Sequence, residues 1–238
     1  MTEAGERGAS EPDAIELAGV SVELGGRPVL HDVSLRLTQR RIAVIGANGS
    51  GKSTFARLLN GLVQPTTGTV RVHGYDVTHE SKQVRERVGF VFSNPDAQIL
   101  MPTVAEDVSF SLRSRRLTRS EITERTDAAL TAYGLSGFRD AAAHSLSGGQ
   151  KQLLALASVL VSEPALVVAD EPTTLLDLGT ALRVSDILIE ELSAQTVIVT
   201  HDLELAARCE IAVRFEAGRV EAIGDPASVI AEYRAVSA

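Results

Sequence analysis

A glycine-rich loop at residues 46–54, with the sequence GANGSGKST, constrains the fold of this chain more than any other feature. It fits the pattern G-x-x-x-x-G-K-[ST] and lies between the apolar run IAVIG and a stretch typical of a helix. Glycines allow successive backbone N–H groups to turn inward around phosphate oxygens, and the following helix presents its positive end to them. This context favours a nucleotide site over a flexible Gly-Ser loop. The predicted phosphate-binding residues are Gly46, Ala47, Asn48, Gly49, Ser50, Gly51, Lys52, Ser53 and Thr54.

Three side chains of this loop have separate predicted tasks. Lys52 is expected to neutralise charge on the β and γ phosphates. The Ser53 hydroxyl is expected to hold Mg²⁺, and Thr54 can support the α and β phosphates. The loop therefore predicts a nucleoside triphosphate bound together with Mg²⁺.

Short apolar runs at residues 42–46, 88–92, 165–170 and 196–200 alternate with stretches of helical character. Strands that are apolar on both faces and alternate with helices are typical of a parallel sheet covered by helices. Residues 15–37 contain two runs of alternating apolar and polar residues around a Gly-Gly-Arg-Pro turn, which predicts an antiparallel hairpin. The runs EIAVRF and GRVEAI predict a second hairpin, with Gly218 in its turn. We expect one α/β nucleotide-binding domain over residues 14–235, a helical subdomain at about 95–147 and a disordered tail at 1–13.

Composition excludes several classes of function. The 238 residues carry 23 Lys and Arg against 31 Asp and Glu, a formal net charge of −8, which argues against a general nucleic-acid binder. Cys209 is the only cysteine, so no intrachain disulfide can form, and we expect it to be a small buried hydrophobic side chain. The longest nearly apolar run, at 153–161, is far short of the roughly 20 residues that cross a bilayer. Work at a membrane would therefore need a partner.

An acidic pair, Asp170 and Glu171, follows a buried run and should lie at the sheet edge where α/β folds bind ligands. Asp170 suits a water-mediated contact with Mg²⁺, and Glu171 suits polarising an attacking water. An acidic helix start with Pro172 in its first turn is the structural alternative, which the phosphate loop makes less favourable. His201 also follows a buried strand, so Lys52, Glu171 and His201 should converge, with His201 near the γ-phosphate or the catalytic water. The histidines expected at the surface are His31, His73, His79 and His144.

The order of the motifs resembles the ATPase subunits of ABC transporters over residues 15–229. LSGGQ at residues 146–150 follows the phosphate loop and precedes ADEPTTLLD and the strand that ends at His201. The resemblance implies a P-loop NTPase with a RecA-like parallel sheet core, an antiparallel β subdomain and an inserted helical subdomain. It also implies ATP hydrolysis in a head-to-tail dimer, with Asp177 in a loop between the two monomers. The residues expected to close on the partner subunit's γ-phosphate are Leu146, Ser147, Gly148, Gly149 and Gln150.

Residues 88–110, VGFVFSNPDAQILMPTVAEDVSF, are similar to the energy-coupling factor group of vitamin and metal importers. Together with the phosphate-loop region they look most like the ATPase of biotin importers. The resemblance implies a second ATPase subunit, either another copy or a paralogue, a transmembrane coupling protein and a substrate-binding membrane protein. It places the chain peripherally on the cytoplasmic face of the cell membrane. A cobalt, nickel or other vitamin importer remains an alternative, as does a regulatory nucleotide-binding module outside transport.

The chain departs from the family pattern at several positions. Leu24 stands where many members stack an aromatic ring on adenine, and Arg27 is an alternative cover for the base. Ser93 replaces the glutamine that contacts Mg²⁺ and reports on the γ-phosphate, so either a water or the nearby Gln98 would bridge the gap. Residues 40–41 are Arg-Arg instead of Gly-Glu, and Leu153 replaces a common arginine. The sequence alone assigns these last changes no role.

Overall fold

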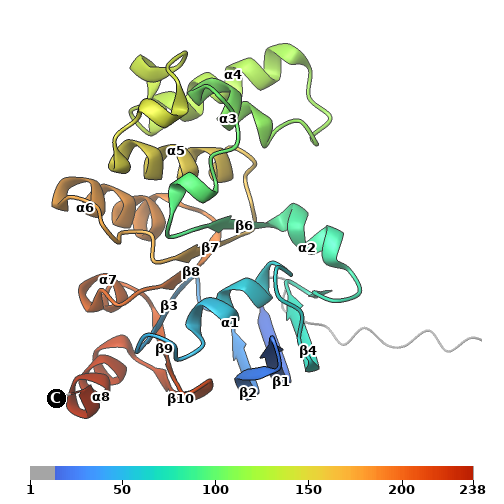
Figure 1. Cartoon of the computed structure of the whole chain (residues 1–238), viewed down its shortest axis with the longest axis vertical. Helices are drawn as coiled ribbons and strands as arrows, with labels where there is room; N and C mark the ends of the chain where they lie inside the picture. The colour runs from blue at the N-terminus through green and yellow to red at the C-terminus, as the bar shows by residue number, and fades with distance from the viewer. Residues whose placement is uncertain (1–13, 238) are drawn as a thin grey trace, which may run out of the picture.

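A computed structural model describes residues 14–237, and the predicted tail at 1–13 lies outside the described residues. A six-stranded sheet forms the centre of the molecule (Figure 1). Its strand order is β10 (Arg219–Gly224), β9 (Ile211–Glu216), β3 (Arg41–Gly46), β8 (Gln195–Val199), β7 (Leu166–Asp170) and β6 (Val88–Val91). All neighbouring strands are parallel except β10, which pairs with β9 in the predicted terminal hairpin. The predicted parallel sheet is therefore confirmed.

A second, four-stranded antiparallel sheet lies beside the first. Its strand order is β2 (Arg27–Leu37), β1 (Ile15–Leu24), β4 (Thr67–Val72) and β5 (Tyr75–Asp76). The pairing of β1 with β2 confirms the predicted hairpin, and Gly25 and Gly26 turn the chain with positive φ angles of 58° and 75°. Glycine suits this turn because it adopts positive φ without steric cost.

Alternate residues of the central strands face two apolar layers. Val44 and Val168 pack toward α1 (Lys52–Leu59) and the four-stranded sheet. Ala43 and Val167 pack into the opposite layer. The helices of that layer are α5 (Gly148–Leu160), α6 (Leu178–Asp186) with a π-helical turn at Ile187–Glu191, α7 (Leu203–Ala207) and α8 (Pro226–Ser237). Burial on both faces explains why these strands are continuously apolar.

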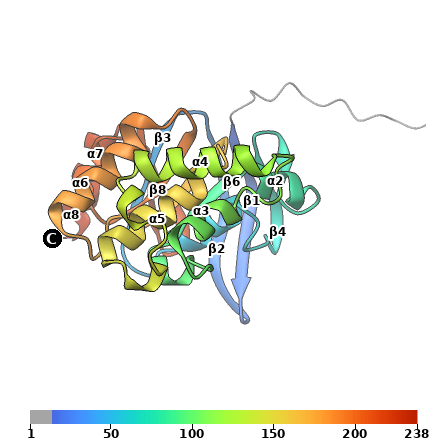
Figure 2. The same ribbon diagram turned by 90° about the horizontal axis from the view of Figure 1, so that it is seen from above.

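Helices fill the chain between β6 and β7. After α2 (Ser81–Arg87) and β6 come α3 (Val104–Phe110) and α4 (Arg119–Ala132), which lie above α5 at the top of Figure 1 and are seen from above in Figure 2. A third apolar cluster joins them through Val104, Leu130 and Leu154. Leu153 is partly buried and packs against both this cluster and the layer that contains Ala43 and Val167. These contacts give its apolar side chain a structural role.

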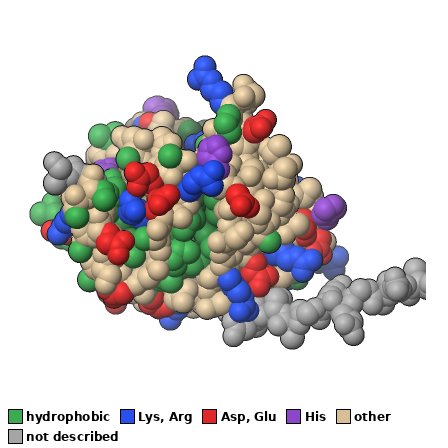
Figure 3. All heavy atoms as spheres, turned by 90° about the horizontal axis from the view of Figure 1, so that it is seen from below, with side chains coloured by type: hydrophobic (Ala, Val, Ile, Leu, Met, Phe, Trp, Pro, Cys, Tyr) green, Lys and Arg blue, Asp and Glu red, His purple; other side chains and the backbone are tan. Residues whose placement is uncertain are grey.

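No helix within residues 14–237 is long and apolar enough to cross a membrane. On the described part of the face drawn in Figure 3, acidic and basic side chains are interspersed.

Candidate functional site

The phosphate loop connects β3 to α1 and needs glycine at two strained positions. Gly46 has a φ of 144°, and a Cβ there would lie 2.2 Å from the carbonyl oxygen of Phe215. Gly51 has a φ of 102° and directly precedes the first residue of α1. The loop therefore packs against β9 and leads directly into α1, whose first turn presents its N–H groups to a ligand.

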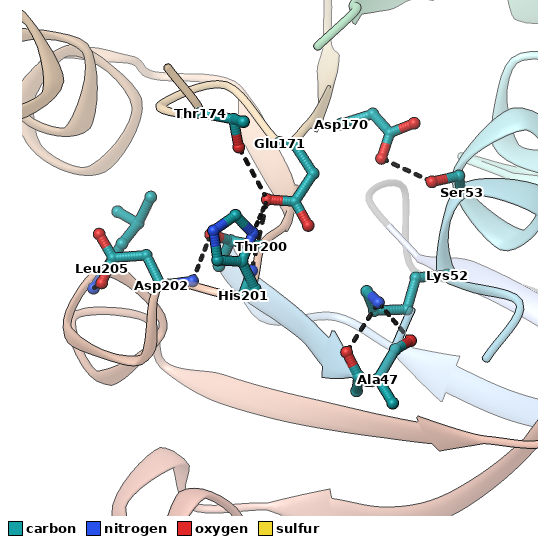
Figure 4. Close-up of polar contacts among 11 residues, drawn as sticks. Ala47, Lys52, Ser53, Asp170, Glu171, Thr174, Thr200, His201, Asp202 and Leu205 are labelled. Carbon is teal, nitrogen blue, oxygen red and sulfur yellow. Dashed lines mark hydrogen bonds and ion pairs between the residues drawn. The ribbon is translucent and has the colours of Figure 1, made fainter. Parts of the chain in front are cut away.

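Lys52 is held at the mouth of this loop. Its Nζ donates hydrogen bonds to the carbonyl oxygens of Gly46, at 2.7 Å, and Ala47, at 2.9 Å (Figure 4). The side chain is 6% exposed, and burial lowers the pKa of Lys52, while attraction from Glu171 and Asp170 opposes that shift. A buried ammonium bonded only to neutral carbonyls is well placed to gain from an incoming anion.

Ser53 and Asp170 come from different elements but meet directly. The Ser53 hydroxyl donates a hydrogen bond to Asp170 Oδ1 at 2.9 Å (Figure 4). Burial raises the pKa of Asp170, and the hydrogen bond from Ser53 acts in the opposite direction. A hydroxyl and a carboxylate at this spacing fit Mg²⁺, which prefers hard oxygen ligands and usually takes its remaining ones from phosphates and water. Among the described residues, no group of three or more His, Cys, Asp or Glu side chains could hold a metal alone.

Glu171 and His201 form the second pair at this sheet edge. His201 Nδ1 lies 2.7 Å from Glu171 Oε2, and the Thr174 hydroxyl donates to the same oxygen at 3.3 Å (Figure 4). Glu171 has a left-handed backbone, with φ 55°, and its N–H donates to the Val199 carbonyl at 2.9 Å. This strained turn directs the carboxylate toward His201, and strain of this kind is characteristic of functional sites.

The LSGGQ segment lies at the start of α5. Ser147 Oγ accepts a hydrogen bond from the Gln150 N–H, and Gln150 Oε1 accepts one from the Ser147 N–H at 2.9 Å. A Cβ on Gly149 would lie 2.9 Å from Thr180 Oγ1, so this glycine allows α5 to contact α6 closely. Because α1 and α5 cover opposite faces of the sheet, these residues lie apart from the phosphate loop (Figure 1). Within residues 14–237 no hydrogen bond joins the two segments.

The residues expected to contact the nucleotide site or the partner subunit, Ser93, Gln98 and Asp177, have different surroundings. Gln98 Oε1 accepts a hydrogen bond from the Phe92 N–H at 3.0 Å, and its Nε2 donates to the Ala155 carbonyl at 3.2 Å. The amide of Gln98 therefore fixes the chain after β6 against α5. Ser93 lies just beyond the end of β6. Asp177 caps α6, accepting from the Thr180 N–H at 3.1 Å and the Thr180 hydroxyl at 2.8 Å.

Two residues were misjudged or missed from sequence. The expectation that His73 is a surface residue is wrong, because it is buried and its Nε2 lies 2.8 Å from Gln195 Oε1. Arg41 is also buried, and its guanidinium donates to the carbonyls of Ile189 and Ala194, each at 2.8 Å. Its partners lie about 150 residues further along the chain, so no local pattern could have found them.

Comparisons with known proteins agree with this geometry. Residues 30–174 match the ABC transporter family. The biotin transport ATP-binding protein BioM of Rhizobium etli is 44% identical over 94% of this chain and 99% of its own length. The energy-coupling factor transporter ATP-binding protein EcfA1 of Bacillus subtilis is 39% identical over 85% of this chain and 74% of its own.

A solved structure shows the same architecture. The structure of cbiO1 from Clostridium perfringens, part of the ABC transporter complex cbiONQ, has a TM-score of 0.83 and 31% identity, covering 95% of this chain and 94% of that one. The fold expected from the resemblance and the likeness to energy-coupling factor and biotin ATPases are both confirmed. The chain belongs to the ABC transporter family as an ATP-binding subunit with ATPase activity.

Proposed function

We propose that this chain is the motor subunit of an energy-coupling factor importer and that biotin is the cargo. The observation that carries the proposal is the convergence of Ser53, Asp170, Glu171 and His201, with Lys52 beside them, at the carboxyl edge of one sheet. Ligands of α/β folds bind at this edge. The 44% identity with a biotin transport protein supports the cargo.

Each residue has a defined task in this mechanism. Lys52 leaves the carbonyls of Gly46 and Ala47 to neutralise the β and γ phosphates. Glu171 accepts or orients the proton of the attacking water, and His201, hydrogen-bonded to Glu171, positions that carboxylate and contacts the γ-phosphate. Ser53 and Asp170 would hold Mg²⁺, which neutralises charge on the phosphate oxygens when bound.

The catalytic site is completed by a second ATPase subunit. Ser147 and the N–H groups at the start of α5 form an anion site that lies apart from the phosphate loop of the same chain. Two subunits arranged head to tail bring the Ser147 site of each onto the phosphate loop of the other. ATP binding closes this dimer, and hydrolysis reopens it.

The motion is passed to a transmembrane coupling protein, which acts with a substrate-binding membrane protein. A cavity of about 700 Å³ lies between α2, β6 and α3, and its lining includes Gln98, Leu100 and Phe110. Gln98 ties the chain after β6 to α5. This part of the chain includes Ser93, at the position expected to report on the γ-phosphate, so the cavity adjoins the segment expected to sense the nucleotide. We assign it to a helix of the coupling protein, which places the chain on the cytoplasmic face of the membrane.

Replacing Glu171 with Gln tests the catalytic assignment. The variant removes the proton acceptor but keeps a side chain of the same size, so ATP should still bind while turnover falls by at least 100-fold. ATP-bound dimers should then accumulate and be detected by sedimentation. Undiminished phosphate release would contradict the role of Glu171. A wild type that binds ATP with no turnover, alone or with its membrane partners, would instead favour a regulatory module.

The cargo is tested by isolating the membrane proteins that copurify with the chain and measuring uptake in vesicles. Labelled biotin should accumulate with ATP, and the Glu171→Gln subunit should abolish that accumulation. Labelled cobalt, nickel and other vitamins serve as competing cargoes. Uptake of one of these in place of biotin would overturn the cargo while leaving the ATPase assignment intact.

A further inference from the structure

A short stretch between α3 and α4 concentrates positive charge in a chain whose formal net charge is −8. This stretch, residues 113–119 with the sequence RSRRLTR, is called the arginine segment below. It contains no acidic side chain, and its exposed arginines are Arg113, Arg115, Arg116 and Arg119. A local excess of exposed cations of this kind indicates a surface that meets a negatively charged partner.

The arginine segment is fixed to the body of the molecule. Leu112, just before it, is fully buried, and Leu117 packs against the apolar cluster shared by α3, α4 and α5. The Arg115 guanidinium donates to the carbonyl oxygens of Ser162, at 2.9 Å, and Glu86, at 3.4 Å. In Figures 1 and 2 the connection from α3 to α4 lies on the same side of the molecule as α2. The arginines are therefore presented on a defined surface.

No acidic side chain neutralises this segment directly. Within residues 14–237 its arginines form no ion pair, and the Arg113 guanidinium lies 5.1 Å from the centre of the Phe110 ring. The side chains of Arg116 and Arg119 make no hydrogen bond to the described part of the chain. Exposed guanidinium groups of this kind remain available to an external anion.

The positive surface continues onto α2. Lys82 and Arg85 of this helix are exposed and line the cavity of about 700 Å³ together with two arginines of the segment. Two acidic residues also line it: Glu86, which is exposed, and Asp107, which is buried and accepts a hydrogen bond from the Ser158 hydroxyl at 2.8 Å. Positive charge therefore prevails at the rim of this cavity.

The breadth of the surface distinguishes an extended partner from a compact one. The arginine segment borders three cavities, of about 700, 530 and 320 Å³. A single peptide helix in the largest cavity would meet only Arg115 and Arg116, because Arg113 and Arg119 line a different one. A bilayer of anionic lipids presents phosphate groups over a wide area and can contact all four arginines at once.

We propose that the arginine segment, with Lys82 and Arg85, binds the anionic lipid headgroups of the membrane surface. This inference rests on the membrane location in the proposed function, since the cavity assigned there to the coupling protein shares this basic rim. Charges in physiological salt act over about 8 Å, so acidic side chains elsewhere on the chain do not cancel the local attraction. Lipid binding holds this cavity next to the membrane that contains its partner.

Vesicle sedimentation with the isolated full chain, without ATP or a membrane partner, tests the proposal. The chain should sediment with phosphatidylglycerol vesicles and not with phosphatidylcholine vesicles, and about 0.5 M NaCl should release it. A variant that combines Arg113→Gln, Arg116→Gln and Arg119→Gln should lower the partition coefficient by roughly 100-fold. Each cation near an anionic surface contributes about fivefold to binding.

A matched variant removes the same charge from the lower part of Figure 1. It combines Arg71→Gln in β4, Arg219→Gln in β10 and Arg234→Gln in α8, all at exposed positions. Its partition coefficient should stay within about twofold of the wild type, since these sites lie beyond the screening length from the arginine segment. Urea unfolding should give the same midpoint for both variants and the wild type, so that a loss of binding reports on the surface and not on folding.

Equal loss of vesicle binding in the two triple variants, or no binding of the wild type to phosphatidylglycerol vesicles, overturns the proposal. Binding of polyglutamate that depends on the arginine segment, without vesicle binding, also overturns it and assigns the surface to an acidic protein segment. These outcomes leave the ATPase and cargo assignments intact, because those depend on the turnover and uptake measurements with Glu171→Gln.

Discussion

At the scale of the residue, Cys209 shows how burial sets reactivity. Burial raises the pKa of Cys209 to about 12 from 9.0, so the thiol stays protonated at neutral pH. We expect the folded protein to react slowly with a thiol reagent at pH 8 and the denatured protein to react at once. Leu175 is 99% exposed, so Leu175→Cys provides the exposed control, which should be labelled rapidly on the folded chain. Rapid labelling of native Cys209 would contradict its burial.

The same pKa shift affects stability in a defined pH window. The folded pKa lies above the unfolded value, so this contribution to stability is complete below pH 9.0 and is lost as the pH rises toward about 12. Urea unfolding at pH 8 and pH 10 should therefore show that the free energy of unfolding falls more between these two pH values for the wild type than for Cys209→Ala.

Residues of the candidate site could be predicted where their neighbours are close in sequence. They could also be predicted where parallel strands end at the same edge of the sheet and so bring their last residues together. The phosphate loop is contiguous, and the meeting of Glu171 with His201 follows from two parallel strands ending at one edge. The two hydrogen bonds of Gln98 could not be predicted in the same way. They depend on how the chain after β6 bends against α5, and no periodic pattern specifies that bend.

At the scale of the element, Arg41 shows how a strand is tied to a distant helix. It begins β3, and its guanidinium donates to the carbonyls of Ile189, Leu192 and Ala194 around the end of the π-helical turn after α6. Burial lowers the pKa of Arg41, and these carbonyls satisfy donors that would otherwise be buried without partners. The apolar run at residues 42–46 predicts β3, but such local patterns do not encode contacts across the sheet.

At the scale of the whole molecule, the sequence predicted two sheets without the link between them. Alternating apolar and polar residues on either side of a turn indicate an antiparallel hairpin, whereas continuous apolar runs indicate buried parallel strands. The fold class could therefore be predicted from these two patterns. The two sheets are joined through His73, just after β4, and Gln195, the first residue of β8. The Gln195 Nε2 also donates to the Gln39 carbonyl at 2.8 Å, next to the start of β3. Only the packed structure brings residues 122 positions apart within hydrogen-bond distance.

This buried link should contribute measurably to the stability of the chain. We expect His73→Ala and Gln195→Ala each to lower the free energy of unfolding by roughly 1–3 kcal/mol, because each leaves the other polar group buried without its partner. In the double variant that unpaired group is absent, so the combined loss should be smaller than the sum of the single losses. Urea unfolding measures all three values. His144→Ala, at an exposed histidine, serves as the control and should change stability by less than about 0.5 kcal/mol. Strict additivity of the two single losses would show that the hydrogen bond between His73 and Gln195 does not couple the sheets.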